Sequence, residues 1–179
     1  MKIIMISGKS QSGKDTFGRI LKEQLEMQNK KVLLIHFADP VKWLARDFFN
    51  WDGNKDIEGR HLLQWIGTDT MRKKYPSYWA EIIAKFISTY EAYFDYCLIC
   101  DWRFKNEFET VCDYNQNVIT VRINRYQNNE NYYNPNMTLE QRWHISECEI
   151  DDFPFEWIIE NRNDITTLEE SAKFLLEHI

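Results

Sequence analysis

The sequence lacks the features that mark membrane and fibrous proteins. It contains only 6 glycines and 4 prolines in 179 residues, which excludes a collagen-like chain. No run approaches the roughly 20 apolar residues that a membrane-spanning helix requires. The apolar start at Met1–Ile6 is too short for a signal peptide. We therefore expect a cytoplasmic protein that does not bind membranes.

Basic residues are also scarce. Lys and Arg total 22 against 28 Asp and Glu, a net charge of −6. A general nucleic-acid-binding protein needs a basic stripe to displace counterions from phosphates, so we expect no nucleic-acid polymer as a partner. A small anionic substrate in a local basic pocket is compatible with this charge. With 44% hydrophobic and 15% aromatic residues, the chain is not disordered, and its length is typical of one domain.

The 4 cysteines do not form a metal-site pattern. Cys97 and Cys100 make a C-x-x-C, but they lie in an apolar run that is typical of a buried strand. Residues an odd number of positions apart on a strand point to opposite faces, so these two thiols cannot share a disulfide or a metal. No second C-x-x-C and no suitably spaced histidine pair accompanies them. We expect free cysteines in the core.

Apolar runs alternate with segments of helical periodicity along the whole chain. The apolar runs predict strands at Ile3–Ser7, Val32–His36, Tyr96–Cys100, Val118–Ile123 and Glu156–Glu160. The periodic segments predict helices at Lys14–Met27, Asp39–Phe49, Arg60–Thr70, Tyr78–Tyr93 and Glu107–Tyr114, and a last helix capped at Thr167. A loop is expected over Asn50–Gly59. This alternation predicts an α/β fold with a mainly parallel, five-stranded sheet.

A phosphate-binding signature joins the first strand to the first helix. Gly8–Thr16 fits G-x-x-x-x-G-K directly after an apolar strand. The glycines allow successive N–H groups to turn inward, the helix dipole attracts anions, and Lys14 reaches the β- and γ-phosphates. A Gly/Ser-rich turn is the plainer alternative. The context favours ATP binding in a three-layer α/β/α fold of the P-loop NTPase type, with contacts from Gly8, Ser10, Ser12, Gly13, Lys14, Asp15 and Thr16.

Magnesium binding departs from the usual pattern. Asp15 follows Lys14 where Ser or Thr is usual, and Thr16 is the next hydroxyl. We therefore expect Mg²⁺ to be held mainly through waters, near Asp15, Thr16 or Asp101. Asp101 follows the third strand, at the edge where α/β proteins bind ligands. Its alternative role is to start a loop or cap a helix.

Four further blocks follow the phosphate loop in order: Phe37–Lys42, Leu63–Asp69, Asp101–Glu107 and His144–Glu147. With the Gly-Lys-Asp-Thr end of the loop, they resemble the deoxynucleoside monophosphate kinases of tailed phages, from Ile3 to about Asn161. The resemblance implies a P-loop kinase core that moves the γ-phosphoryl group of ATP to a deoxynucleoside 5′-monophosphate (dNMP). A phage-encoded chain would act in the host cytoplasm. The base of the acceptor is left open.

Phosphoryl transfer between two anions explains which side chains are candidates. An acceptor phosphate is already a nucleophile, so the task is to align two charged groups with Mg²⁺, lysine and bidentate guanidinium groups. The resemblance implies that Arg103 binds the acceptor phosphate or sugar and that Asp101 binds the metal or the acceptor. The catalytic candidates are Lys14, Asp101, Arg103 and Arg142. The acceptor-binding candidates are Asp39, Lys42, Arg60, Gln64, Thr68, Arg72, Asp101, Arg103, His144 and Glu147.

Several acceptor candidates keep an alternative role. Arg60, Gln64 and Thr68 share one face of their predicted helix, which is either an acceptor-binding strip or a solvated surface. Asp39 contacts the acceptor sugar or caps the helix before a proline, and Lys42 binds the acceptor or lies on the helix surface. Within a single kinase domain over residues 1–179, we expect the helical region 38–93 to bind the acceptor.

The segment 125–147 is predicted to be a lid. Residues 126–137 are rich in Asn, Tyr and Gln and are the least core-like part of the chain. We expect Arg125 to contact ATP and His144 to organise the lid as a partner of Glu147 or of phosphate. Closure would exclude the water that competes with the acceptor.

Two other functions and one other interface stay open. A P-loop kinase of another phosphorylated small molecule, of the phosphomevalonate or dephospho-coenzyme A type, shares the same core. A nucleotide-sensing switch would bind ATP or GTP to control a partner, but the Asn-Lys-x-Asp segment usual in GTP switches is absent. The apolar stripe of Tyr78–Tyr93 is either core or the face of a homodimer.

Overall fold

The computed structural model describes residues 1–54, 56–127, 130–132, 134–135 and 137–179. Its strands are β1 (Lys2–Gly8), β2 (Val32–Ile35), β3 (Tyr96–Trp102), β4 (Val118–Gln127), β5 (Glu130–Asn131) and β6 (Trp157–Asn161). Parallel pairing gives the order β2-β3-β1-β4-β6, and β5 pairs antiparallel with the end of β4. The five parallel strands and the α/β class are confirmed. The additional strand, β5, was not predicted, because its two residues are too few to show an alternating pattern.

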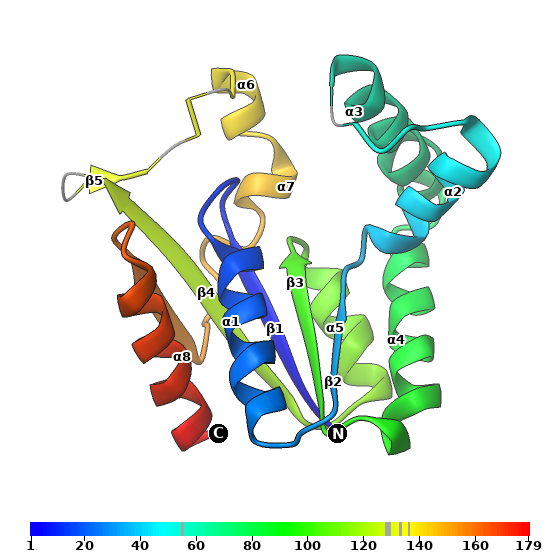
Figure 1. The fold of residues 1–179 in the computed structure, drawn as a ribbon. Helices are drawn as coiled ribbons and strands as arrows, with labels where there is room; N and C mark the ends of the chain where they lie inside the picture. The colour runs from blue at the N-terminus through cyan, green and yellow to red at the C-terminus, as the bar shows by residue number, and fades with distance from the viewer. Residues whose placement is uncertain (55, 128–129, 133, 136) are drawn as a thin grey trace.

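Helices cover both faces of the sheet (Figure 1). They are α1 (Lys14–Met27), α2 (Asp39–Phe49), α3 (Ile57–Gln64), the π-helix η1 (Trp65–Arg72), α4 (Tyr78–Tyr90), the 3₁₀ turn η2 (Glu91–Tyr93), α5 (Lys105–Tyr114), α6 (Leu139–Arg142), α7 (Ile145–Cys148) and α8 (Ile165–His178).

The alternation of side chains along the central strands creates two cores. Ile4 and Ile6 of β1 pack with residues of α1 and α8, whereas Ile3 and Met5 pack with residues of α4 and α5. Cys100 belongs to the first core and Cys97 to the second. This confirms that the two thiols point to opposite faces, and both are free.

Three predicted helix starts were wrong, and the smallest difference is at α5, which begins at Lys105 and not at Glu107. The helix expected at Arg60–Thr70 begins at Ile57, because Asp56 caps it by accepting from the N–H of Gly59 (2.8 Å), and its second half continues as the π-helix η1. The expected loop over 50–59 is correspondingly shorter. The last helix begins at Ile165, and its cap is Asp164, not Thr167.

The short helices gather at the carboxyl edge of the sheet. In Figure 1, α2 and α3 lie on one side of this edge and α6 and α7 on the other, and α7 lies beside the loop from β1 to α1. The α2–η1 region has its own small core of Val41, Ala45, Trp51, Ile66 and Trp79. Residues from distant parts of the chain therefore converge around the phosphate loop.

Candidate functional site

The loop between β1 and α1 has the strand-loop-helix geometry that its sequence predicts. The backbone is left-handed at Gln11 (φ 60°) and at Gly13 (φ 99°), and α1 begins at Lys14. Glycine accepts this backbone without strain. A Cβ on Gly13 would also lie 2.5 Å from Nδ2 of Asn161, at the end of β6. The second glycine of the motif is thus required both by its dihedral angle and by its neighbour.

The first glycine is required by close packing. A Cβ on Gly8 would lie 2.3 Å from Oγ of Ser12 and 2.6 Å from the carbonyl oxygen of Ile123. From the other side, Nδ2 of Asn161 donates to the carbonyl oxygen of Ser12 (2.8 Å). The loop is therefore held in shape by β4 and β6 before any ligand binds.

Lys14 lies buried at the start of α1. Its Nζ donates to the carbonyl oxygen of Lys9 (3.1 Å) within the same loop. Burial, helped by the positive charge of Arg103 and opposed by neighbouring carboxylates, lowers the pKa of Lys14 to about 8. A bound polyphosphate would favour the charged ammonium. The two cations Lys14 and Arg103 are thus close enough to interact electrostatically.

The predicted lid contacts the outside of the loop. Nη1 of Arg125 donates to the carbonyl oxygen of Gln11 (2.7 Å), and its guanidinium lies 4.1 Å from the ring centre of Tyr132. The hydroxyl of Tyr132 donates to Oε1 of Gln11 (2.9 Å). Nδ2 of Asn134 donates to Oγ of Ser10 (3.1 Å). Arg125 therefore contacts the phosphate loop itself.

Glu147 of α7 occupies the anion-binding side of the loop. Its Oε2 accepts from the backbone N–H of Ser10 (2.8 Å), and its Oε1 pairs with the guanidinium of Arg103. Nζ of Lys9 donates to the backbone carbonyl of Glu147 and pairs with Asp151. A carboxylate thus binds one of the N–H groups that the sequence assigns to phosphate.

The space left between loop and lid is small. A cavity of about 20 Å³ remains, lined by Lys9, Ser10, Asn134, Met137, Arg142 and Glu147. That is room for about one water molecule. Nη2 of Arg142 points to the carbonyl oxygen of Asn134 (3.4 Å). A phosphate group does not fit into a space of this size.

Asp101 joins the end of β3 to the start of α2. Its two carboxylate oxygens accept from the backbone N–H groups of Phe37 (2.8 Å) and Ala38 (3.0 Å). Arg103, two positions along, donates from Nη1 to the carbonyl oxygen of Ser146 (3.0 Å) in α7. Asp101 therefore fixes the backbone at the start of α2, while Arg103 reaches across to α7.

His36 is a site residue that the sequence analysis missed. It directly follows β2, and its Nε2 lies 3.5 Å from Oδ1 of Asp15 and its Nδ1 3.3 Å from Oδ2 of Asp39. Hydrogen bonds from the ring nitrogens of His36 to the carboxylates of Asp15 and Asp39 raise the pKa of His36 to about 9, against the effect of burial. The only sequence signal was a lone histidine beside the Phe37–Lys42 block. Its partner Asp15 lies in α1, which is distant in the sequence.

Asp39 lies between two cations. It accepts from the backbone N–H of His36 (2.8 Å) and from Nζ of Lys42 (3.0 Å). Burial disfavours its ionised form, but the hydrogen bonds from His36 and Lys42 prevail and hold the pKa of Asp39 well below its usual range. Lys42 is therefore tied to Asp39 and does not extend as an isolated surface lysine.

Arg72 and Glu107 form a buried pair behind Arg103. Nη2 of Arg72 donates to Oε1 of Glu107 (2.7 Å), and its guanidinium lies 4.0 Å from the ring centre of Phe104. Oε2 of Glu107 accepts from the backbone N–H groups of Arg103 (2.9 Å) and Phe104 (3.1 Å). Burial raises the pKa of Glu107 to about 7, and Arg72 opposes the shift. Glu107 thus fixes the backbone that carries Arg103, a role the sequence analysis did not assign.

Other predicted acceptor residues are less closely grouped. Arg60 and Gln64 are exposed on α3, and Thr68 lies in η1, where the i→i+5 bonding of a π-helix changes the spacing of the predicted strip. The ring of His144 bonds Oγ of Ser146 (2.8 Å), whereas the carboxylate of Glu147 bonds Ser10 and Arg103.

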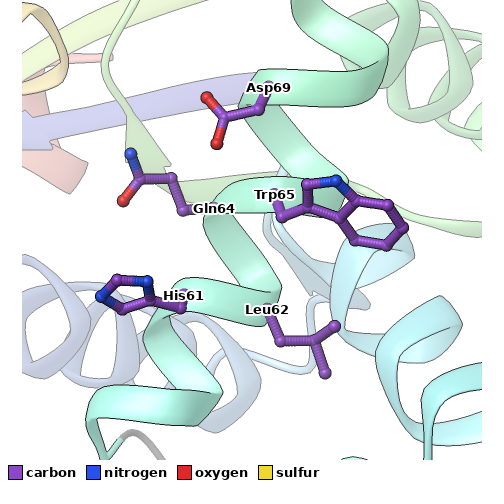
Figure 2. Close-up of a pocket in the computed structure, with 5 residues that line it drawn as sticks. All are labelled: His61, Leu62, Gln64, Trp65 and Asp69. Atoms are coloured by element: carbon purple, nitrogen blue, oxygen red, sulfur yellow. The ribbon is translucent and has the colours of Figure 1, made fainter.

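A shallow hollow of about 540 Å³ follows α3 and η1. Figure 2 shows Gln64 and Asp69 pointing to one side of the helix, and Leu62 and Trp65 to the other. Its lining residues are His61, Leu62, Gln64, Trp65 and Asp69. Of the predicted acceptor residues, Gln64 lines this hollow.

The side chains near the loop provide only part of a magnesium site. In the part of the chain that the structure describes, no three His, Cys, Asp or Glu side chains lie together as a metal site. Asp15, in the first turn of α1, is 78% exposed. Mg²⁺ usually keeps several waters and takes one or two carboxylates plus substrate phosphates, and Asp15 fits that arrangement.

No described helix has the length and apolar character needed to cross a membrane.

Comparisons with known proteins support the fold. No protein-family model matches the chain, and no curated protein matches its sequence. Among solved structures, the chain is similar to a sugar kinase from Janibacter sp. HTCC2649, with 14% identity, 99% of this chain and 95% of that chain covered, and a TM-score of 0.57. It is also similar to the Mycobacterium tuberculosis APS kinase CysC in complex with AMPPNP and APS, with 10% identity, coverage of 98% and 95%, and a TM-score of 0.52. A mutant of the same APS kinase gives 11% identity, coverage of 98% and 96%, and a TM-score of 0.53. The chain therefore has the fold of P-loop kinases.

Proposed function

We propose that this chain is an ATP-dependent kinase that transfers the γ-phosphoryl group to a deoxynucleoside monophosphate, giving the diphosphate. The observation that carries the proposal is a preformed phosphate loop whose Lys14 lies within electrostatic reach of Arg103. The P-loop kinase fold supports phosphoryl transfer, and the four sequence blocks around the site support a dNMP acceptor.

The donor side is built from backbone. The loop from Gly8 to Gly13 supplies N–H groups, and the N-terminus of α1 adds its dipole. Lys14 would bind the β- and γ-phosphates and neutralise charge as the transferred group leaves ADP. Mg²⁺, held by the ATP phosphates and by waters near Asp15, would supply further neutralisation.

The acceptor side is built from side chains. Arg103 is the proposed ligand of the acceptor phosphate, because its charge acts on Lys14 and its backbone is fixed by Glu107. Arg72 is the second candidate, since its Nη1 is buried without a hydrogen-bond partner within the described residues. The hollow along α3 and η1 is the proposed place for the sugar and base. Asp101 and Asp39 would act by holding α2 in position.

The lid must open before ATP binds. Glu147 and a triphosphate tail compete for Ser10 and Arg103, because both are anionic and both need the same donors. We propose that opening withdraws Glu147 and leaves Arg103 available to the acceptor. Reclosure with Arg125 and Arg142 near the phosphates would exclude water.

A coupled assay with ATP, Mg²⁺ and every canonical and modified dNMP tests the proposal. Rapid ADP formation with at least one dNMP is expected. The panel should also contain APS, phosphomevalonate and dephospho-coenzyme A, because the likeness to an APS kinase makes another phosphorylated acceptor the second candidate. ADP formation with one of these and none with any dNMP would replace the dNMP assignment and keep the donor site.

A binding measurement distinguishes a failure to bind ATP from a failure to use the acceptor. Binding of a non-hydrolysable ATP analogue, measured by calorimetry, reports on the loop alone. Binding without transfer to any acceptor would favour the nucleotide-sensing switch. The absence of binding would remove the kinase proposal altogether.

A further inference from the structure

One face of α4 is apolar and exposed. Tyr78, Ile82, Phe86 and Tyr90 are between 37% and 42% exposed, and Tyr93 of η2 is 65% exposed. The opposite face of the same helix is buried, with Trp79, Ala80, Ile83, Ala84 and Ile87 in the core. The predicted stripe of Tyr78–Tyr93 is thus divided into a core face and an outward face, and the outward face needs a separate explanation.

The outward face is mostly aromatic, and its line of residues carries no charge. The ring centres of Phe86 and Tyr90 are 4.8 Å apart, and those of Tyr90 and Tyr93 are 6.1 Å apart. The charged pair Glu81 and Lys85 lies beside the line of aromatic residues, not within it. In Figure 1, α4 lies at the outer side of the molecule, away from the loop between β1 and α1.

The spacing of these residues is symmetric about Phe86. Ile82 and Tyr90 lie one turn to either side of it, and Tyr78 and Tyr93 lie about two turns away. An antiparallel two-fold pairing of two such helices places Phe86 against its own copy and Ile82 against Tyr90 of the other copy. A self-complementary patch of this kind is what an isologous interface requires.

The exposed area is also of the right size. With roughly 200 Å² for a fully exposed large side chain, the five exposed fractions amount to roughly 450 Å² of apolar surface on each copy. A standard interface buries about 800 Å² per partner, of which somewhat more than half is apolar. We propose that the α4 face, defined by Tyr78, Ile82, Phe86, Tyr90 and Tyr93, is the interface of a homodimer with antiparallel α4 helices.

Sedimentation velocity over about 1–100 µM protein tests the dimer. The wild-type mass is expected to rise toward twice 21.7 kDa, and Phe86→Lys is expected to keep the monomer mass. Phe174→Lys is the matched control, because Phe174 is 54% exposed on α8 at another face. It should dimerise as the wild type does. A wild-type chain that stays monomeric at the highest concentration overturns the proposal, and so does a dimer that Phe86→Lys leaves intact.

Cross-linking tests the symmetry directly. Phe86→Cys is expected to form an intermolecular disulfide, because the two-fold axis passes beside this position, while Phe174→Cys stays uncrosslinked. If sedimentation shows a dimer but neither Phe86→Cys nor Phe174→Cys forms an intermolecular disulfide on oxidation, the α4 interface is contradicted. If Phe86→Lys fails to fold, Tyr90→Lys serves in its place. The mass measurements do not depend on kinase activity, so either proposal can fail without the other.

Discussion

The phosphate loop and the lid that lies on it are held by different kinds of contact. The loop is fixed by backbone geometry, by close packing against Ile123, and by a hydrogen bond from Asn161. The lid is fixed by side chains, among them Glu147 on Ser10 and Tyr132 on Gln11. A loop of the first kind keeps its shape without a ligand, whereas charged side-chain contacts are exchanged when a competing anion arrives. The difference supports our proposal that the loop is preorganised and that the lid moves.

Removal of the loop lysine should have the largest effect. Lys14→Ala is expected to lower kcat/KM by roughly 10³-fold, because a preorganised charge at the transferred group is lost. Since burial already disfavours the charge of Lys14, the free energy of unfolding should change by no more than about 1 kcal/mol. Steady-state kinetics and urea unfolding give the two values. Lys22→Ala, further along α1, is the matched control, and turnover near the wild-type rate in Lys14→Ala would refute the donor assignment.

Arg103 pairs with Glu147 of the lid, and its charge acts on Lys14 of the loop. Its removal should therefore affect use of the acceptor and binding of ATP to different extents. Arg103→Ala is expected to lower kcat/KM for the acceptor by roughly 10²-fold, with a smaller change in ATP binding. The guanidinium is the proposed acceptor ligand, and it also pairs with Glu147. Kinetics at varied acceptor and calorimetry with the ATP analogue distinguish the two effects. Arg19→Ala, at an exposed position of α1, is the control, and equal losses for donor and acceptor would contradict an acceptor role.

Neutralising the lid carboxylate should act in the opposite direction. Glu147→Gln is expected to tighten binding of the ATP analogue by about tenfold, or about 1.4 kcal/mol, because the competing charge leaves the loop. Calorimetry measures this change, and Glu140→Gln in α6 is the control. Weaker binding in Glu147→Gln would mean that Glu147 contributes to nucleotide binding and does not compete with it.

Local patterns predicted the loop better than they predicted the lid. The strand, the two glycines and Lys14 are contiguous in sequence, so their geometry follows from dihedral preferences and from the strand-to-helix context. The opposite faces of Cys97 and Cys100 follow from strand alternation alone.

Contacts between distant elements left no comparable signal. Glu147 meets Ser10, and His36 meets Asp15, only because the sheet brings the carboxyl ends of its strands together. The same holds for Glu107, which resembles any acidic residue in the first turn of a helix. The cap at Asp164 was missed for another reason: Thr167–Glu170 fits the capping-box pattern, whereas Asp164 has no Glu or Gln three positions later and caps without one.

The smallest predicted effect is a pH dependence at the border between the loop and α2. The pKa of His36 is higher in the folded chain, about 9, than its ordinary 6.5, so the folded state binds this proton more tightly. The stabilisation is complete below about pH 6.5 and is lost as the pH rises through 9. Because Asp15 is well exposed, it should amount to on the order of 1 kcal/mol.

Urea unfolding of the wild type and of His36→Gln at pH 6 and at pH 9.5 measures this contribution. The difference between the two proteins is informative, because Lys14 titrates in the same range with the opposite sign: its pKa is lowered on folding, so stability gains as the pH rises above about 8. At pH 6 the free energy of unfolding should be larger for the wild type than for His36→Gln, and at pH 9.5 this difference should disappear. His61→Gln on α3 should show no such change. An advantage of equal size at both pH values would mean that His36 stabilises the fold by packing and not by its charge between Asp15 and Asp39.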